Sequence, residues 1–344
     1  MRQNALKHQY LYIKISLIFI LICNFFPTKT IAAEITKETK EEFKGEIGEW
    51  KTTESLLEPV SKHYSFSVLD KIYIFTGQNL ATSRAIVLSS EIDENGIKSW
   101  KKAPPLAYVL EEFGAYYKDG YLYIAGGKNM GFERGSVISF PINPDGTLGR
   151  ANSAFFLPEP LIKTAVTVNK GYIFVCGGKI GNKLSNKVFS SPIDNNGIPG
   201  KWQELAPLPV SVYDHIMFSY NDFIYVSGGY HNGESVYGAK VSSPGTIEKW
   251  ISMDDMPLSL EKHAGIVYKD YIFISGGIKD GIPQSKVFAG KFLEGGLIIF
   301  WKELKSLPQP VFSHSITINK NFMIVSGGIS GGRPQTKILI SPIH

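Results

Sequence analysis

The sequence predicts an all-β protein built as a six-bladed β-propeller with four antiparallel strands per blade. Three observations predict it. An apolar strand ending in glycine recurs six times, each copy is followed by further strand and turn signals, and the strand missing from the last copy stands before the first. Repeats of about 20 to 50 residues are typical of stacked supersecondary units.

The repeat is defined by an anchor glycine that closes the second strand of each copy. The anchors are Gly77, Gly127, Gly178, Gly229, Gly277 and Gly328. They are 50, 51, 51, 48 and 51 residues apart, and all but Gly77 follow a second glycine. This regularity predicts six equivalent blades.

Each copy then resolves into four strands. The first, such as 64–69, joins the anchor strand through a tight turn such as Asp119-Gly120 or Lys170-Gly171, and the third is exemplified by 85–92 or 187–193. The next turn carries glycine, which supplies positive φ: Asn95-Gly96, Asp145-Gly146, Asn196-Gly197, Pro244-Gly245 and Gly295-Gly296. The fourth strand carries a tryptophan in four copies, namely Trp100, Trp202, Trp250 and Trp301. One copy lacks it, at 149–152. A large indole once per unit suits packing between neighbouring sheets.

Closure of the ring follows from the two ends of the repeat region. The last copy stops at His344 after its third strand, 337–342, while 44–50 carries the turn glycine and Trp50. Pairing these segments removes two exposed sheet edges. We expect an N-terminal strand to join the last blade, which gives a propeller domain over 45–344.

The N-terminal residues predict export. Arg2, Lys7 and Lys14 precede an apolar run at 15–26, and small Ala32 and Ala33 follow it. We expect a signal peptide at 1–33, cleavage after Ala33, a flexible charged lead-in at 34–44, and a periplasmic or extracellular mature protein without a transmembrane span. An uncleaved anchor is the alternative, although the run is short for a bilayer.

Charge excludes one class of partner. The chain has 36 basic and 31 acidic residues. Four of the basic residues and none of the acidic ones precede Glu34, so 32 basic residues remain against 31 acidic ones. A near-neutral body gives no general attraction for phosphates, so we predict no nucleic-acid partner.

Candidate site residues gather at one end of the blades. The first two strands are antiparallel, so the start of the first and the end of the second meet there, at the mouth of the central channel. Fourteen residues before the anchors stand His63, Phe113, Thr164, His215, His263 and His314. The preceding residues are Lys62, Glu112, Lys163, Asp214, Lys262 and Ser313, and four anchors are followed by Gln78, Lys128, Lys179 and Tyr230. Arg134 and Arg333 lie in nearby loops.

Two interpretations of the histidines stay open. They form a ring of imidazoles that helps to hold a ligand, or each ties its strand to a backbone group of the next blade. Metal-ligand motifs with short spacing are absent, and four ligands from separate blades would have to converge across a wide hub. We predict no metal site and no cofactor.

The paired glycines after the second strand and the tryptophan of the fourth resemble the kelch repeat family over 45–344. That resemblance implies a propeller whose mouth face contacts peptides or sugars, so we expect a non-catalytic binding module for a carbohydrate or protein partner. One alternative is a sugar-acid isomerase similar to exported kelch-type sialate mutarotases, with acid, base and cation drawn from Glu112, Asp214, His215, Lys163 and Lys262. Another is a structural module of a surface assembly. No catalytic residue is assigned.

Overall fold

The structure, a computed structural model, describes residues 45–344 except 80–81, 94–95, 104–108 and 153–154. The predicted signal peptide and lead-in lie outside these residues, as does Asn95 of one predicted turn. The described residues contain no helix, and therefore none long and apolar enough to cross a membrane.

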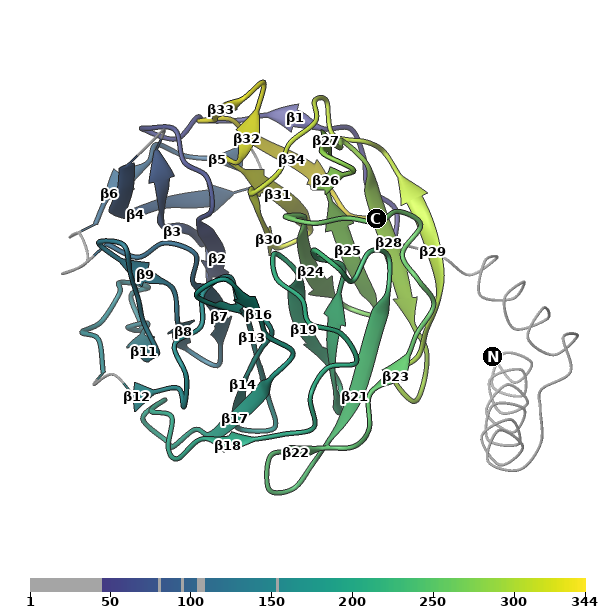
Figure 1. Ribbon diagram of the computed structural model, residues 1–344. Helices are drawn as coiled ribbons and strands as arrows, with labels where there is room; N and C mark the ends of the chain where they lie inside the picture. Colours follow the sequence, from purple (N-terminus) through teal and green to yellow (C-terminus); the bar gives the residue numbers. More distant parts are fainter. Residues whose placement is uncertain (1–44, 80–81, 94–95, 104–108, 153–154) are drawn as a thin grey trace, which may run out of the picture. The chain divides into compact units, whose positions relative to one another are not determined.

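Six antiparallel sheets surround a common centre, so the predicted six-bladed propeller is confirmed (Figure 1). The first strand of each blade lies nearest the centre, and the later strands follow outward in chain order, except that β1 forms the outer strand of the last blade. Neighbouring first strands contact one another, for example β13 (Ala165–Asn169) and β19 (Ile216–Tyr220). The starts of these strands therefore meet in one ring.

The first three blades have these strands. Blade 1 consists of β2 (Tyr64–Val68), β3 (Lys71–Asn79), β4 (Thr82–Asp93), β5 (Gly96–Ile97) and β6 (Lys101–Lys102), the last two both pairing with β4. Blade 2 consists of β7 (Gly114–Lys118), β8 (Tyr121–Ala125), β11 (Ser136–Pro141) and β12 (Phe155–Phe156). Blade 3 consists of β13, β14 (Tyr172–Cys176), β17 (Val188–Pro192) and β18 (Gln203–Glu204).

The other three blades repeat this order. Blade 4 consists of β19, β20 (Phe223–Ser227), β21 (Val236–Ser242), β22 (Thr246–Ile247) and β23 (Ile251–Ser252). Blade 5 consists of β24 (Ala264–Tyr268), β25 (Tyr271–Ser275), β28 (Val287–Phe292) and β29 (Ile298–Leu304). Blade 6 consists of β30 (Ser315–Asn319), β31 (Phe322–Ser326), β34 (Ile338–Pro342) and β1 (Lys51–Thr52).

Blade 6 closes the ring as predicted. β1 is antiparallel to β34, with Lys51 opposite Ile340 and Thr52 opposite Leu339. The paired strand therefore begins just after Trp50, and an isolated bridge from Ile47 to Ile343 extends the contact. Ion pairs of Glu46 with Lys302 and of Glu49 with Lys305 tie the same segment to blade 5.

Three of the tryptophans are hydrogen-bonded to a neighbouring blade, in keeping with their predicted packing between sheets. The indole of Trp50 donates to the Lys305 carbonyl at 3.0 Å, that of Trp250 to Ala206 at 3.1 Å, and that of Trp301 to Asp254 at 3.1 Å. In each case the acceptor belongs to the preceding blade. Trp301 lies within its strand, whereas the others stand directly before theirs.

The core consists of apolar clusters between adjacent sheets. One joins blades 3 and 4 through Phe174, Val188, Ile224 and Val226, all of them buried. Full burial of a large aliphatic or aromatic side chain contributes about 1.5–3 kcal/mol, so the sheets hold one another in place.

Short hairpins follow the anchor glycines in four blades, where the sequence indicated only polar loops. They are β9 (Lys128–Asn129) with β10 (Phe132–Glu133), β15 (Lys179–Ile180) with β16 (Lys183–Leu184), β26 (Ile278–Lys279) with β27 (Ile282–Pro283), and β32 (Ile329–Ser330) with β33 (Arg333–Pro334). They stand at the mouth of the channel, because the residue after each anchor pairs with the segment that leads into the first strand.

Candidate functional site

The residue before the first strand's histidine position has a left-handed backbone in all six blades. The six residues, with φ between 52° and 55°, are Lys62, Glu112, Lys163, Asp214, Lys262 and Ser313. This conformation costs a non-glycine residue about 1–2 kcal/mol. We call these residues the mouth ring.

Hydrogen bonds between blades hold this unfavourable backbone. The amide of Lys62 donates to the Ser313 carbonyl at 2.8 Å, that of Ser313 to Lys262 at 2.9 Å, and that of Lys262 to Asp214 at 2.9 Å. Lys163 donates to Glu112 in the same way at 2.6 Å. In these four blades the left-handed turn aims the amide at the preceding blade, so backbone hydrogen bonds link four of the neighbouring blade pairs at the mouth.

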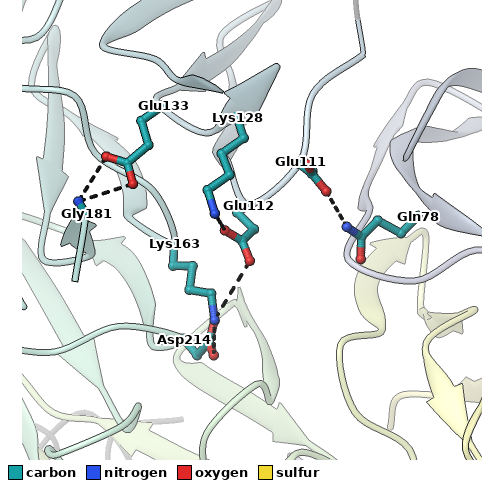
Figure 2. A network of polar contacts seen from close by, with 8 residues as sticks. All are labelled: Gln78, Glu111, Glu112, Lys128, Glu133, Lys163, Gly181 and Asp214. Carbon is teal, nitrogen blue, oxygen red and sulfur yellow. Dashed lines mark hydrogen bonds and ion pairs between the residues drawn. The ribbon is translucent and has the colours of Figure 1, made fainter. Parts of the chain in front are cut away.

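Side chains of the mouth ring form a chain of alternating charge (Figure 2). Lys163 Nζ lies 3.4 Å from Asp214 Oδ2 and 3.9 Å from Glu112 Oε1. Lys128, which follows an anchor glycine, lies 3.1 Å from Glu112 Oε2. Lys262 continues the chain, 3.9 Å from Asp214 and 3.7 Å from Glu261. Three lysines and three carboxylates therefore balance one another.

These charges are partly shielded from water. The Asp214 and Glu112 side chains are only 15% and 16% exposed, and the lysines beside them are somewhat more accessible. Charge pairs at this depth interact more strongly than fully exposed ones, because water screens them less. The chain of charge therefore gives this side of the mouth a defined electrostatic pattern.

Three further residues of this site, which the sequence analysis did not predict, stand two residues before the histidine position. Glu111 accepts a hydrogen bond from Gln78, Glu261 pairs with Lys262, and Tyr213 lies beneath two lysines. Their backbones pair with the residues that follow the anchors, for example Glu111 with Lys128 and Tyr213 with Tyr230. That common repeat position is the signal that could have found them.

An aromatic pair borders the charged chain. The rings of Tyr213 and Tyr230 are 4.9 Å apart, and the His231 ring meets Tyr230 edge-on at 4.5 Å. The ammonium groups of Lys163 and Lys179 lie 4.9 and 5.4 Å from the Tyr213 ring centre. Tyr230 is 45% exposed, so an aromatic surface remains open to a ligand.

The four candidate histidines lie one residue further along and are buried between blades. Nε2 of His63 lies 2.8 Å from the Ser326 hydroxyl, and Nε2 of His314 lies 2.9 Å from the Ser275 hydroxyl. His215 contacts the Cys176 thiol at 3.5 Å. The inter-blade tie expected as one interpretation exists for these three histidines, but it runs to a side chain of the preceding blade rather than to a backbone group of the next. Neither ring nitrogen of His263 has a hydrogen-bond partner among the described residues.

Burial keeps these imidazoles neutral at physiological pH. It lowers the pKa of His63, His215 and His314 to about 3 and that of His263 to about 4. The cause is desolvation, which disfavours the charged form. The structure therefore separates the histidines from the charged chain with which the sequence grouped them.

The remaining candidates occupy the rim. Arg134 and Arg333 are exposed, and within the described ranges neither guanidinium forms an ion pair with a carboxylate. Near Arg134, the Glu133 carboxylate accepts the Gly181 amide of the next hairpin at 3.0 Å (Figure 2). Lys62 completes the mouth ring beside Ser313. Contact of any of these residues with a ligand stays a prediction.

The central channel contains a cavity of about 390 Å³ lined by the six first strands. Its walls combine polar side chains with apolar and aromatic ones, and the Tyr116 hydroxyl reaches Ser219, two blades away, at 3.4 Å. Among the residues that the structure describes, no group of three or more His, Cys, Asp and Glu side chains is arranged to hold a metal ion.

Comparison with known proteins supports the fold. No family model matches the chain. Beta-scruin of Limulus polyphemus is 27% identical and alpha-scruin of the same species 23% identical, each over 197 residues that make up 52% of this chain and 20% of the relative. The match therefore spans only a fifth of the length of these relatives.

A solved structure is similar over a larger share of the chain. The structure of YjhT superposes with a TM-score of 0.64 at 14% identity, covering 84% of this chain and 99% of that one. This likeness and the six sheets confirm the predicted six-bladed propeller fold.

Proposed function

We propose that this kelch-type propeller is an exported, non-catalytic binding module that holds a carbohydrate or a protein at its channel mouth. The observation that carries the proposal is the half-buried chain of alternating charge from Lys128 to Glu261, bordered by exposed Tyr230. Aromatic surface beside fixed polar groups suits recognition of either ligand class.

The fold itself does not require these charges. Ser313 adopts the same left-handed backbone and donates the same inter-blade hydrogen bond as Lys262, with a small neutral side chain. Serine would therefore satisfy the structural demand in the other blades. Charged residues at the five other positions point to a role outside folding.

Serine substitutions test this role directly. We expect Lys163→Ser and Asp214→Ser to abolish binding in a glycan array, or to stop crosslinking to a protein from a photoreactive residue placed at Tyr230. The matched control is Lys320→Ser. Lys320 is also left-handed and ion-paired, to Asp70 at 3.1 Å, but it lies in the β30–β31 turn at the far end of its blade. Binding that survives both mouth substitutions would move the site elsewhere.

Export rests on the N-terminal pattern of positive, apolar and small residues. We expect the recovered mature protein to begin at Glu34 and to fractionate outside the cytoplasm. After expression with the natural leader, cell fractionation followed by N-terminal sequencing of the recovered protein measures both. An intact leader on cytoplasmic protein would contradict export.

A sugar-acid mutarotase is the second candidate. Its support is that carboxylates of Glu112 and Asp214 flank the Lys163 ammonium at 3.9 and 3.4 Å, an arrangement that offers proton-transfer groups on either side of a cation. NMR of freshly dissolved sialic acid tests it. Anomer interconversion at the buffer rate would eliminate this function and leave the binding module.

A further inference from the structure

Two soft sulfur donors and an imidazole nitrogen lie close together between blades 3 and 4. The Cys176 thiol sulfur lies 3.5 Å from Nε2 of His215 and 3.4 Å from the Met217 thioether sulfur. All three side chains are buried. Atoms that bind one metal ion at about 2.0–2.3 Å lie roughly 3.5–4 Å from one another, so a slight opening of this cluster would admit an ion.

The same place in other blades shows what the hydrogen bond alone needs. Facing His63, His263 and His314 stand Ser326, Ser227 and Ser275, and two of these hydroxyls bond the imidazole at 2.8 and 2.9 Å. A serine would therefore serve better than a thiol 3.5 Å away. Cysteine occurs at this place only beside His215.

The third donor is confined to the same interface. Two residues after His215 stands Met217, whereas the equivalent positions hold Ser65, Ala115, Val166, Gly265 and Ile316. Cys176 and Met217 thus each occur once at their repeat positions, in blades 3 and 4. The fold brings both side chains together beside His215. Neither change is required by the histidine contact.

Charge selects the class of ion. A thiolate, a neutral imidazole and a thioether carry one negative charge, so a monovalent soft cation makes a neutral cluster, which suits a buried site. Thiolate and thioether ligands favour monovalent copper and similar ions. His215 Nδ1, which has no hydrogen-bond partner among the described residues, can keep the imidazole proton and leave Nε2 free to coordinate.

An ion can reach the cluster through the channel. His215 and Met217 both line its cavity of about 390 Å³, and Cys176 lies directly behind them. We propose that Cys176, His215 and Met217 form a binding site for a soft monovalent metal ion such as Cu(I). Binding replaces the sulfur–hydrogen bond by a sulfur–metal bond and releases the thiol proton to solvent, without oxidation or reduction.

Silver(I) tests the site because it needs no reductant. The full chain carrying Cys23→Ser is titrated with silver nitrate in chloride-free buffer containing a competing thiol. We expect one ion bound per chain, one proton released per ion, and a higher thermal unfolding temperature. Absence of stoichiometric uptake would overturn the site.

Two substitutions examine the donors. Cys176→Ser, which installs the residue of the other interfaces, should fold and take up no Ag(I). Met217→Leu should weaken uptake at least about tenfold, since it removes a metal ligand at nearly constant volume. Met253→Leu is the control, because Met253 is also a buried methionine but lies outside the cluster. Equal uptake by Met217→Leu and the parent would show simple reaction with a thiol and refute the three-donor site.

The repeat permits the converse experiment. Ser275→Cys with Ile316→Met, in the Cys176→Ser chain, places the same three donors around His314. We expect stoichiometric Ag(I) uptake to return, and Ser275→Cys alone to bind at least about tenfold more weakly. A folded triple variant that binds no ion would show that these donors do not suffice.

Discussion

Two adjacent residues in every blade have opposite roles in the structure. The histidine position is buried between blades in five of the six blades and partly buried at Phe113, whereas the mouth-ring residue before it turns left-handed and lies at the channel mouth. His314 must fit Ser275 of the neighbouring blade, while Ser313 contributes mainly its backbone amide. The histidine position therefore constrains the side chain, whereas the mouth-ring position before it constrains only the backbone.

The pairing at the buried position supports this distinction. Phe113 replaces histidine in blade 2, and the facing position of blade 1 then holds Phe75 in the same apolar cluster. Thr164 replaces it in blade 3 and bonds the Cys176 carbonyl of its own blade at 2.8 Å. Residues at the buried position thus match their surroundings, while the mouth ring accepts lysine, carboxylates and serine.

Lowering the pH should produce the largest difference in stability between the histidine position and the mouth ring. The folded histidines have pKa values of about 3 to 4, below the 6.5 of free histidine, so between these limits the unfolded chain binds protons that the fold does not. Stability is complete above pH 6.5 and is lost as pH falls, by on the order of 1.4 kcal/mol per pH unit for each histidine. Urea unfolding at pH 7.5, 6.0 and 5.0 measures the loss.

The pH window separates histidines from carboxylates. Ordinary carboxylates protonate mainly below pH 5, so the mouth ring should contribute little between pH 6.5 and 5. A chain with His63→Gln and His314→Gln should show about half the slope, provided that it folds at pH 7.5. An unfolding midpoint unchanged from pH 7.5 to 5.0 would contradict the burial of neutral histidines.

Truncation at the two positions should also differ. We expect His314→Ala to lower the free energy of unfolding by about 2–4 kcal/mol, because it opens a cavity and leaves the Ser275 hydroxyl without its partner. Ser313→Asn should change it by no more than about 0.5 kcal/mol, since asparagine tolerates left-handed backbone. Urea unfolding at pH 7.5 compares them. Equal losses would mean that the mouth ring also depends on its side chains.

The first glycine of each anchor pair packs closely against the buried histidine position. A Cβ on Gly276 would lie 2.3 Å from the Val311 carbonyl and 2.6 Å from Cε1 of His314, whereas one on Gly331 would meet nothing within 4 Å. Both glycines are left-handed, with φ of 57° and 58°. Gly276→Ala should therefore cost about 1–3 kcal/mol more than Gly331→Ala in urea unfolding. Equal losses of unfolding free energy in the two variants would mean that only the left-handed backbone, and not close packing, requires glycine at Gly276.

The blades, the closure of the ring and the mouth face could be predicted from the sequence because each depends on periodic patterns. Glycine spacing, turn dipeptides and Trp50 located them. It could not separate His314 from Ser313, because strand alternation does not reveal where the backbone turns left-handed. Nor could it connect Lys163 to Glu112 and Asp214, about 50 residues away in each direction, since that contact depends on how neighbouring blades pack.

The smallest effect on stability should accompany the largest effect on binding. Lys163→Gly removes the ion pairs with Asp214 and Glu112, which costs up to about 1 kcal/mol, but it also relieves left-handed backbone worth about 1 kcal/mol. We expect a net change in the free energy of unfolding within about 0.5 kcal/mol, together with loss of ligand at the mouth. Urea unfolding and ligand binding on one preparation measure both quantities. A loss of stability above about 2 kcal/mol would place Lys163 with the buried histidines, because the side chain would then be holding the blades together rather than facing a partner.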